Sequence, residues 1–394
     1  MKDKIDSYKK LCSGCGLCAE QGVKFLENEK GFLVPELHEE NLEFCKQVCP
    51  ASYRAGLHTE ASSVWGHSEA VYLGYSTDDD IRFKASSGGV TTATAIYLLE
   101  HNLVEGILQC GVTKEDPFTV KLFCNQTVEE VKRCIGSRYI TSSPLLNIFD
   151  LIVPGKKYAF IGKPCDVIAL KNYRETNEIL KESIVYLLSF FCAGVPSKAV
   201  NYSLIEKMGC KLSELRKLTY RGNGWPGYAI ATDVNGKEYS MTYNDSWGKV
   251  LGRDVRTYCR FCLDGFGEQA DIACGDAWYI KGNKPDFSEH QGRNVIFART
   301  KKGQQLLQEM AAANVIELSA YNNFESELPI IQAYQERRRT TVKGKIVALK
   351  VSNKPYPMWD RKTVNVLSKF GGMRKNLSMM KGIVSRIKEG KIEL

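Results

Sequence analysis

The sequence predicts an α/β protein with three parts: a small cysteine-rich domain, an α/β core and a basic C-terminal tail. Three observations support this organisation. Five of the fourteen cysteines lie in the first 60 residues, where periodic apolar residues are scarce. From about residue 64 to residue 333, short apolar runs alternate with helix-like stretches, which is typical of a sheet with at least partly parallel strands. The last 58 residues carry 16 Lys and Arg but only 3 Asp and Glu.

Length and composition limit the class of protein. The chain has 394 residues, 43% hydrophobic and 25% charged, which is enough for two or three domains with ordinary apolar cores. This excludes a disordered chain and a small disulfide scaffold. The first residues contain no apolar stretch, and the longest apolar run, residues 184–195, is shorter than the ~20 residues that span a bilayer. We therefore expect no secretory signal, no transmembrane segment, and a cytoplasmic protein whose cysteines bind metal or stay free.

The first cysteine group defines the domain predicted at residues 1–60. Cys12, Cys15 and Cys18 have the C-x2-C-x2-C spacing with which three thiolates bind an iron-sulfur cube. In bacterial ferredoxins a fourth cysteine follows after three more residues; here that position is a glycine, and a Cys-Pro pair comes later, at Cys49. The pattern predicts one ferredoxin-like [4Fe-4S] cluster held by Cys12, Cys15, Cys18 and Cys49, with Cys45 as the alternative fourth ligand. A zinc knuckle or two unrelated thiol pairs are the other interpretations of the same cysteines.

The core is expected in two parts, residues 64–150 and 151–336. Strands are expected at residues 71–75, 106–110, 157–162 and 184–191, and helices at residues 91–100, 128–134, 166–173 and 197–208. A second strand-rich section, residues 218–242, contains turn signals such as Asn235-Gly.

A second cysteine group is predicted within this core. Cys165 and Cys192 each follow an expected strand and precede an expected helix, and the carboxyl ends of parallel strands meet at one edge of a sheet. Cys259 and Cys262 add a C-x2-C pair. Together the four thiols make a complete site for a second [4Fe-4S] cluster. Alternatively, the pair is half a zinc site and the other two thiols are buried, or Cys274 replaces one ligand.

Two loops are candidates for binding a phosphate-bearing ligand. Ser86, Ser87, Gly88 and Gly89 lead directly into the helix expected at residues 91–100, where free backbone amides and the helix dipole attract anions. Ser137, Arg138 and Tyr139 lie in a second loop with groups suited to phosphate, ribose or an aromatic ring. An ordinary helix cap and a solvated loop are the alternatives. The five histidines fall in none of these motifs, which argues against histidine-based hydrolysis or zinc-deaminase chemistry.

The order of these motifs resembles that of the coenzyme F420 hydrogenase/dehydrogenase beta subunit family, which also includes ferredoxin-dependent reductases of the 7-hydroxymethyl chlorophyll type. The resemblance covers about residues 10–310. It is carried by residues 12–18, 85–89, 136–139, 162–165, 191–197, 220–226, 259–262 and 270–278.

The resemblance implies two kinds of cofactor. Family members bind FAD beside a [4Fe-4S] cluster, and several carry further ferredoxin-type clusters. By motif, FAD would be surrounded by Ser86, Ser87, Gly88, Gly89, Ser137, Arg138 and Tyr139, and the core cluster would be held by Cys165, Cys192, Cys259 and Cys262. Lys163, Ala193 and Cys274 depart from the residues common in the family, and these departures bear on the substrate more than on the cofactors.

The function implied is that of an iron-sulfur flavoprotein oxidoreductase. Electrons would pass from a ferredoxin or another electron-transfer protein through two [4Fe-4S] clusters to FAD, which would reduce a small organic substrate or exchange hydride with a deazaflavin, coenzyme F420. Arg221 and Asp276 are possible polar groups on the substrate side. The alternative is a non-catalytic electron-transfer subunit of a larger redox complex. A zinc-stabilised nucleic-acid-binding module is a third interpretation, but the tail lacks interleaved aromatic residues, so we expect no nucleic-acid partner.

The basic tail is expected at residues 337–394. It carries a net charge of +13, whereas the preceding 336 residues carry −4. An amphipathic helix is predicted from the spacing of Leu377, Met380, Ile383, Val384 and Ile387. We expect this tail to dock an acidic ferredoxin or a membrane surface in a salt-sensitive manner.

Overall fold

The structure is a computed structural model that describes residues 2–52, 63–113 and 116–392. The domain boundary expected near residue 60 lies outside the described residues.

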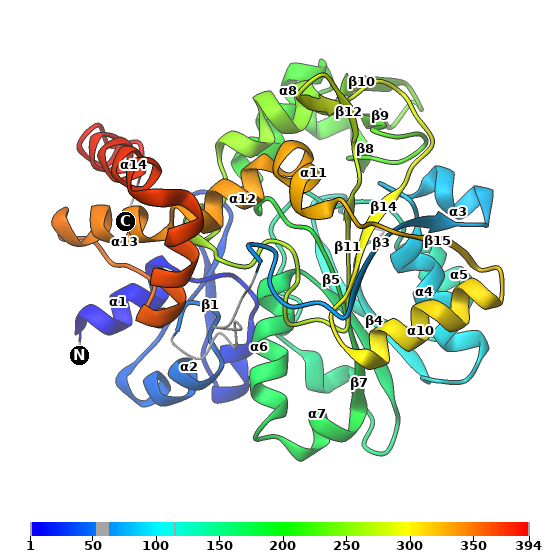
Figure 1. Cartoon of the computed structure of the whole chain (residues 1–394), viewed down its shortest axis with the longest axis horizontal. Helices are drawn as coiled ribbons and strands as arrows, with labels where there is room; N and C mark the ends of the chain where they lie inside the picture. Colours follow the sequence, from blue (N-terminus) through cyan, green and yellow to red (C-terminus); the bar gives the residue numbers. More distant parts are fainter. Residues whose placement is uncertain (1, 53–62, 114–115, 393–394) are drawn as a thin grey trace.

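An eight-stranded mixed sheet forms the centre of the molecule (Figure 1). Its order is β15-β3-β14-β11-β7-β6-β4-β5. The four central strands β11, β7, β6 and β4 pair in parallel, and the outer pairs are antiparallel. The strands are β3 (Ala70–Ser76), β4 (Gly106–Val112), β5 (Val120–Asn125), β6 (Tyr158–Gly162), β7 (Ile184–Phe190), β11 (Ile272–Asp276), β14 (Asn294–Ala298) and β15 (Ile316–Ala320). This confirms the predicted α/β class with partly parallel pairing.

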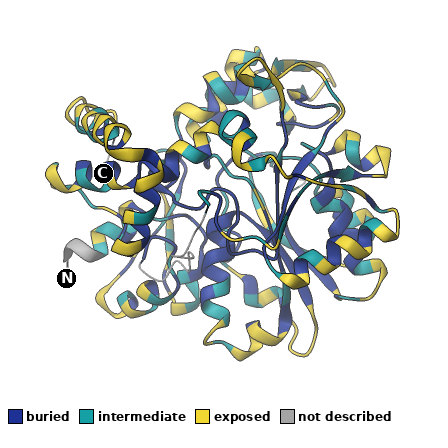
Figure 2. Ribbon diagram, viewed as in Figure 1, coloured by how far each residue is buried: buried dark blue, intermediate teal, exposed yellow. Residues whose placement is uncertain are grey.

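Helices cover both faces of this sheet, and the central strands are buried between them (Figure 2). Side chains alternate between the two faces along each strand, so Ile107 packs with one layer and Leu108 with the other. One layer contains α3 (Asp79–Lys84), α4 (Val90–Glu100), α5 (Val128–Arg133) and α10 (Lys301–Ala312); the other contains α6 (Pro164–Arg174) and α7 (Glu178–Ser183). Local signals start these helices: Thr127 and Glu130 form a capping box at α5, and Pro164 occupies the first turn of α6.

The strand-rich section beyond β7 forms a separate antiparallel sheet of order β10-β9-β8. Its strands are β8 (Leu215–Thr219), β9 (Tyr228–Asp233) and β10 (Glu238–Thr242), and α8 (Lys198–Met208) packs beside it. Short helical turns complete the region at η4 (Leu212–Glu214), η5 (Asn244–Gly248) and η6 (Leu251–Arg253), followed by α9 (Thr257–Phe261) and the hairpin of β12 (Tyr279–Lys281) and β13 (Lys284–Asp286).

The N-terminal segment is built from short elements around its cysteines. They are α1 (Lys2–Lys10), η1 (Leu17–Gln21), β1 (Phe25–Glu27), β2 (Leu33–Pro35), η2 (Glu39–Asn41) and α2 (Leu42–Val48). A further turn, η3 (Ile148–Leu151), packs beside them.

The C-terminal helices pack against both the N-terminal segment and the core (Figure 1). They are α11 (Phe324–Ile331), α12 (Ala333–Thr340), α13 (Val342–Val351) and α14 (Arg361–Lys388). Leu349 and Leu367 share one apolar cluster with Leu11 of the first segment and with Cys165 and Cys262 of the core. The boundary expected between residues 336 and 337 falls inside α12. No helix within the described ranges is long and apolar enough to span a bilayer.

Candidate cofactor sites

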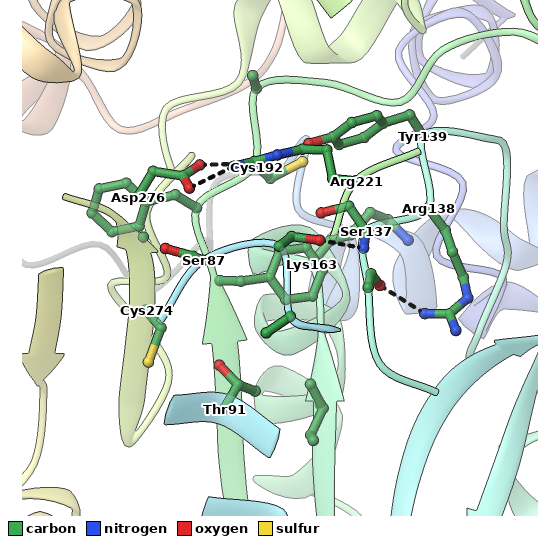
Figure 3. A pocket seen from close by; sticks show the side chains of 18 of the residues that line it. Ser87, Thr91, Ser137, Arg138, Tyr139, Lys163, Cys192, Arg221, Cys274 and Asp276 are labelled. Carbon is green, nitrogen blue, oxygen red and sulfur yellow. Dashed lines mark hydrogen bonds and ion pairs between the residues drawn. The ribbon is translucent and has the colours of Figure 1, made fainter. Parts of the chain in front are cut away.

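A cavity of about 300 Å³ opens where the central parallel strands end. Lys163 follows β6, Cys192 lies just beyond β7, and Asp276 ends β11 (Figure 3). Because these strands run in the same direction, their carboxyl ends meet at one edge of the sheet, where ligands of open α/β sheets gather. The topology therefore brings three distant parts of the sequence to one cavity.

The two predicted phosphate loops meet at this cavity. The backbone N–H of Ser137 donates to Ser86 Oγ at 2.7 Å. Gly89 caps α4 with a φ of +79°, a conformation that favours glycine. Gly88 has no space for a side chain, because a Cβ would come within 2.7 Å of Asn294 Oδ1. Six of the seven predicted residues line the cavity, namely Ser86, Ser87, Gly89, Ser137, Arg138 and Tyr139.

The donors at this edge fit an anionic, aromatic cofactor such as FAD. Arg138 Nη1 donates to the carbonyls of Cys134 and Gly136, both at 2.9 Å, while its Nε is buried without a protein partner. A buried donor left unpaired is costly, so an acceptor from a ligand would complete it. The same cavity has an aromatic side: the rings of Tyr139 and Trp247 lie 4.6 Å apart.

Arg221 and Asp276 also line the cavity, but they bind each other. The guanidinium forms a bidentate ion pair at 2.9 and 3.0 Å, and Trp225 Nε1 donates to Asp276 Oδ1 at 2.8 Å. Arg221 also lies over the ring of Tyr243, with 4.6 Å between Cζ and the ring centroid. The ion pair therefore contacts two further aromatic residues, Trp225 and Tyr243, of which Tyr243 lines the cavity.

The four thiols of the second cysteine group come from distant loops and lie near enough to act on one another. Burial raises the pKa of the Cys165 thiol, and the nearby Cys192 and Cys262 raise it further. Burial and the neighbouring Cys259 and Cys262 raise the pKa of Cys192 to about 12. The four thiols therefore interact with one another. Cys192 also lines the cavity, whereas the Cys274 thiol lies against Thr91 (Figure 3).

The first cysteine group contains five thiols rather than four. All five line one small apolar cavity: Cys12, Cys15, Cys18, Cys45 and Cys49. Burial has the largest effect on the pKa of Cys49 and raises it. The charges of Cys18, Cys15 and Cys12 raise it further, so this thiol lies near all three cysteines of the local run. Cys45 Sγ lies 3.7 Å from Cys18 Sγ. The structure brings both candidates for the fourth ligand to the site.

The chemistry of both groups suits an iron-sulfur cluster. In a [4Fe-4S] cluster each cysteine binds a different iron, so the four thiols need not converge on one point. Among the residues that the structure describes, no group of three or more His, Cys, Asp or Glu side chains is arranged to share a single ion. At the first group, a side chain at Gly14 would collide with the guanidinium of Arg256, whose charge acts on Cys12. A cation beside buried thiols favours their ionised, metal-binding form.

Tyr258 lies between the two cysteine groups. Its hydroxyl donates to the carbonyl of Pro50, the residue after Cys49, at 3.3 Å. Burial raises the pKa of Tyr258, and Cys262 and Cys165 of the second group and Cys49 of the first raise it further. The first group, the second group and the cavity are therefore contiguous.

Comparisons with known proteins show the family of the chain. Residues 71–150 match the family model "Coenzyme F420 hydrogenase/dehydrogenase, beta subunit N-term", and residues 155–323 match the companion model for the C-terminal part of the same beta subunit. Together the two models span more than half of the chain. The chain belongs to this family.

Individual relatives of this beta-subunit homologue are distant in sequence. It is 25% identical over 308 residues to the coenzyme F420 hydrogenase subunit beta of Methanococcus voltae, covering 74% of this chain and 99% of that protein. It is 26% identical over 234 residues to the F420-dependent formate dehydrogenase subunit beta of Methanocaldococcus jannaschii, covering 58% of each. A chain of the F420-reducing [NiFe] hydrogenase complex from Methanosarcina barkeri has a similar fold, with a TM-score of 0.56 and 20% identity over 74% of this chain and 97% of that one.

The beta-subunit homologue also has site residues that the sequence did not identify. Lys163 was noted only as a departure from the family; its Nζ lies 2.7 Å from Asp166 Oδ2 and donates to Ser142 Oγ at 3.0 Å. Arg338 and Gln335, from α12, reach the second cysteine group. For Lys163 the only local signal was Asp166, three residues later at the start of α6. Gln335 and Arg338 had no such signal, because they contact Cys192 across 143 and 146 residues of sequence.

Proposed function

We propose that this homologue is an iron-sulfur flavoprotein oxidoreductase. Electrons would pass between a ferredoxin-like donor, two [4Fe-4S] clusters and FAD, to reduce a small organic substrate or to exchange hydride with the deazaflavin coenzyme F420. The contiguity of the three sites carries the proposal: Tyr258 donates to the carbonyl of Pro50 beside Cys49, Cys262 and Cys165 raise the pKa of the same tyrosine, and Cys192 belongs to the second group and to the cavity wall. Clusters transfer single electrons, whereas a flavin exchanges single electrons for a hydride, so the combination connects the two kinds of chemistry.

The protein's own residues would bind and orient these groups. Cys12, Cys15, Cys18 and Cys49 would hold the first cluster, and Cys165, Cys192, Cys259 and Cys262 the second. Ser86, Ser87, Gly88 and Gly89 would present backbone amides to the FAD phosphates at the start of α4. Ser137 and Arg138 would donate from the facing loop, and the ring of Tyr139 would lie against the cofactor.

Lys163 would supply an ammonium group, paired with the Asp166 carboxylate, to the wall of the cavity. Burial acts to lower its pKa, but the negative charges of Asp166, Cys165 and Cys110 outweigh that effect and raise the pKa. The ammonium therefore stays protonated in the ordinary pH range. Because the ammonium is paired with Asp166, it would act on a ligand in the cavity as a hydrogen-bond donor rather than as a net charge.

The names of the relatives support a second candidate function. Those described above are beta subunits of a hydrogenase and of a formate dehydrogenase. By analogy, this chain would be the electron-transfer subunit of a larger redox complex, with the substrate chemistry on another subunit. The two functions share the cofactor sites and differ in whether the isolated chain reduces a small molecule.

Anaerobic purification of the full chain tests the proposal directly. We expect about eight irons and one flavin per chain, from two clusters and one FAD, and reduction of an added acceptor by the isolated chain. Two clusters and flavin without such activity would favour the electron-transfer subunit. Zinc without iron or flavin would overturn both functions.

Substitution of one ligand tests the assignment of the second group. Cys259→Ser should remove about half of the iron and leave the first cluster intact, because Cys259 belongs to the second group, where it acts on Cys192. Iron analysis and electron paramagnetic resonance (EPR) spectra of the reduced protein measure this loss. Cys124→Ser, at a partly exposed thiol on β5, is the matched control and should keep all the iron. Full iron content in Cys259→Ser would contradict the assignment.

A further inference from the structure

Helix α12 places two side chains against the second cysteine group, and one of them, Gln335, also lines the cavity. Arg338 Nη1 donates to the carbonyl of Cys259 at 3.1 Å, and Nη2 donates to the carbonyl of Cys192 at 3.0 Å. Gln335 Nε2 donates to the same Cys192 carbonyl at 3.0 Å, and its Oε1 accepts from Arg338 Nη2 at 2.6 Å. Both side chains are buried. Two residues of the cysteine group are therefore joined by one guanidinium.

A glycine in the neighbouring loop, Gly265, makes room for the side chains of Arg338 and Gln335. A Cβ at Gly265 would overlap with Arg338 Nη2 and Gln335 Oε1. The carbonyl of the same glycine accepts the backbone N–H of Cys192 at 2.7 Å. A glycine is thus needed where the cysteine loop, the guanidinium and the amide meet, which is the close approach that glycine permits.

Arg338 differs from its two arginine neighbours. Arg337 is exposed to solvent, and Arg339 forms a buried ion pair with Glu268 at 2.7 Å. Arg338 has no carboxylate partner among its described contacts, and its guanidinium donates to the carbonyls of Cys259 and Cys192. Its positive charge therefore acts mainly on the cysteine group.

We propose that Arg338 is a positioning residue that raises the reduction potential of the second cluster. This inference rests on the proposed function, because it requires a cluster at these cysteines. Reduction adds one electron from the donor to the cluster and breaks no bond, so the added negative charge is stabilised by a cation fixed nearby. Net charge and hydrogen bonds near a cluster are established determinants of its potential. Arg338 lies beyond residue 323, where the match to the family model ends.

The test is an EPR-monitored redox titration of the full-length anaerobic chain. Arg338→Gln should shift the midpoint potential of one cluster to a more negative value and leave the other unchanged. Arg338→Lys keeps the charge and should restore most of the wild-type potential. Arg337→Gln removes an exposed charge from the same helix and should shift neither cluster, because solvent screens it.

A second variant tests the role of Arg338 in case Arg338→Gln loses its second cluster. Gln335→Glu places a carboxylate beside the guanidinium and offsets its charge without removing it, so the same negative shift is expected. No shift in Gln335→Glu, or an unchanged potential in Arg338→Gln with full iron content, would overturn the inference. An equal shift in Arg338→Lys would show that the shape of the guanidinium, not its charge, matters. Wild-type protein without iron would instead refute the proposed function.

Discussion

At the scale of single residues, the ion pair between Lys163 and Asp166 connects the three sites. It lies at the cavity, its side chains are 10% and 1% exposed, and the charge of Asp166 acts on Cys15 of the first cysteine group and on Cys165 of the second. Breaking a buried pair leaves one charge without a partner, which costs far more than breaking an exposed one. The pair should therefore stabilise the fold around all three sites.

We predict that Lys163→Met lowers the free energy of unfolding by about 3–5 kcal/mol, because Asp166 is left buried and unpaired. The double variant Lys163→Met/Asp166→Leu should recover much of that loss. Urea unfolding followed by circular dichroism measures both. Lys84 and Asp80 form an exposed pair at 2.8 Å, with side chains 53% and 52% exposed; Lys84→Met is the control and should cost under about 0.5 kcal/mol. Equal costs for the two lysines would contradict this role.

At the scale of elements, strands β3, β4, β6 and β7 of the large sheet were predicted, and strands β5, β11, β14 and β15 were not. The expected strand at residues 157–162 and helix at residues 166–173 correspond to β6 and α6. These elements follow local rules, because each buried strand is a continuous apolar run and each helix begins at a local start signal. β11, β14 and β15 have five residues each, and β14 pairs with β3, more than 200 residues earlier. Such pairing leaves little local signal.

The residues of the candidate cofactor sites also divide into those in local motifs and those brought in by long-range contacts. The loop at residues 85–89 and the run at residues 12–18 are local motifs, so their residues could be named from spacing. Arg338 could not, because it contacts the Cys259 carbonyl across 79 residues of sequence. From the sequence alone, Arg338 could not be distinguished from the other basic residues of the tail.

Helix α14 combines a buried and an exposed face, and a matched pair of leucines distinguishes them. Leu367 is 1% exposed and packs in the cluster shared with Cys165 and Cys262, whereas Leu377 is 46% exposed. We predict that Leu367→Ala lowers the free energy of unfolding by about 2–5 kcal/mol, through lost burial and a cavity, and that Leu377→Ala costs no more than about 0.5 kcal/mol. Urea titrations of both variants at matched iron content measure the difference. Similar values would show that α14 does not support the core.

At the scale of the whole molecule, the excess positive charge of the tail lies on two separate sets of residues. Arg338, Arg339 and Lys345 are buried and bind the core. The other set is exposed on α14 and includes Lys369, Arg374 and Lys381. A chain ending at Glu336 would lose both sets at once, so surface substitutions are needed to separate partner docking from folding.

We predict that the triple variant Lys369→Glu/Arg374→Glu/Lys381→Glu slows reduction by an acidic ferredoxin by about tenfold at low salt, because charged surfaces steer association. The difference should vanish at high ionic strength. Stopped-flow reduction at several salt concentrations measures the rate. Lys207→Glu/Lys211→Glu/Lys249→Glu makes the same change in net charge on another surface and should react like the wild type. Equal slowing in both variants would exclude a docking role for α14.

The position of α12 over the second cysteine group also constrains how the protein matures. Cys165, Cys192, Cys259 and Cys262 all precede Arg338 in the chain, so a ribosome completes the cysteine loops before it makes the residues that cover them. A chain that docked α12 before receiving iron would have to open again to admit it. For the cluster proposed at these cysteines, delivery of iron and sulfide would therefore be coupled to the last step of folding, and a delay in that delivery would leave an apo chain with its C-terminal helices undocked.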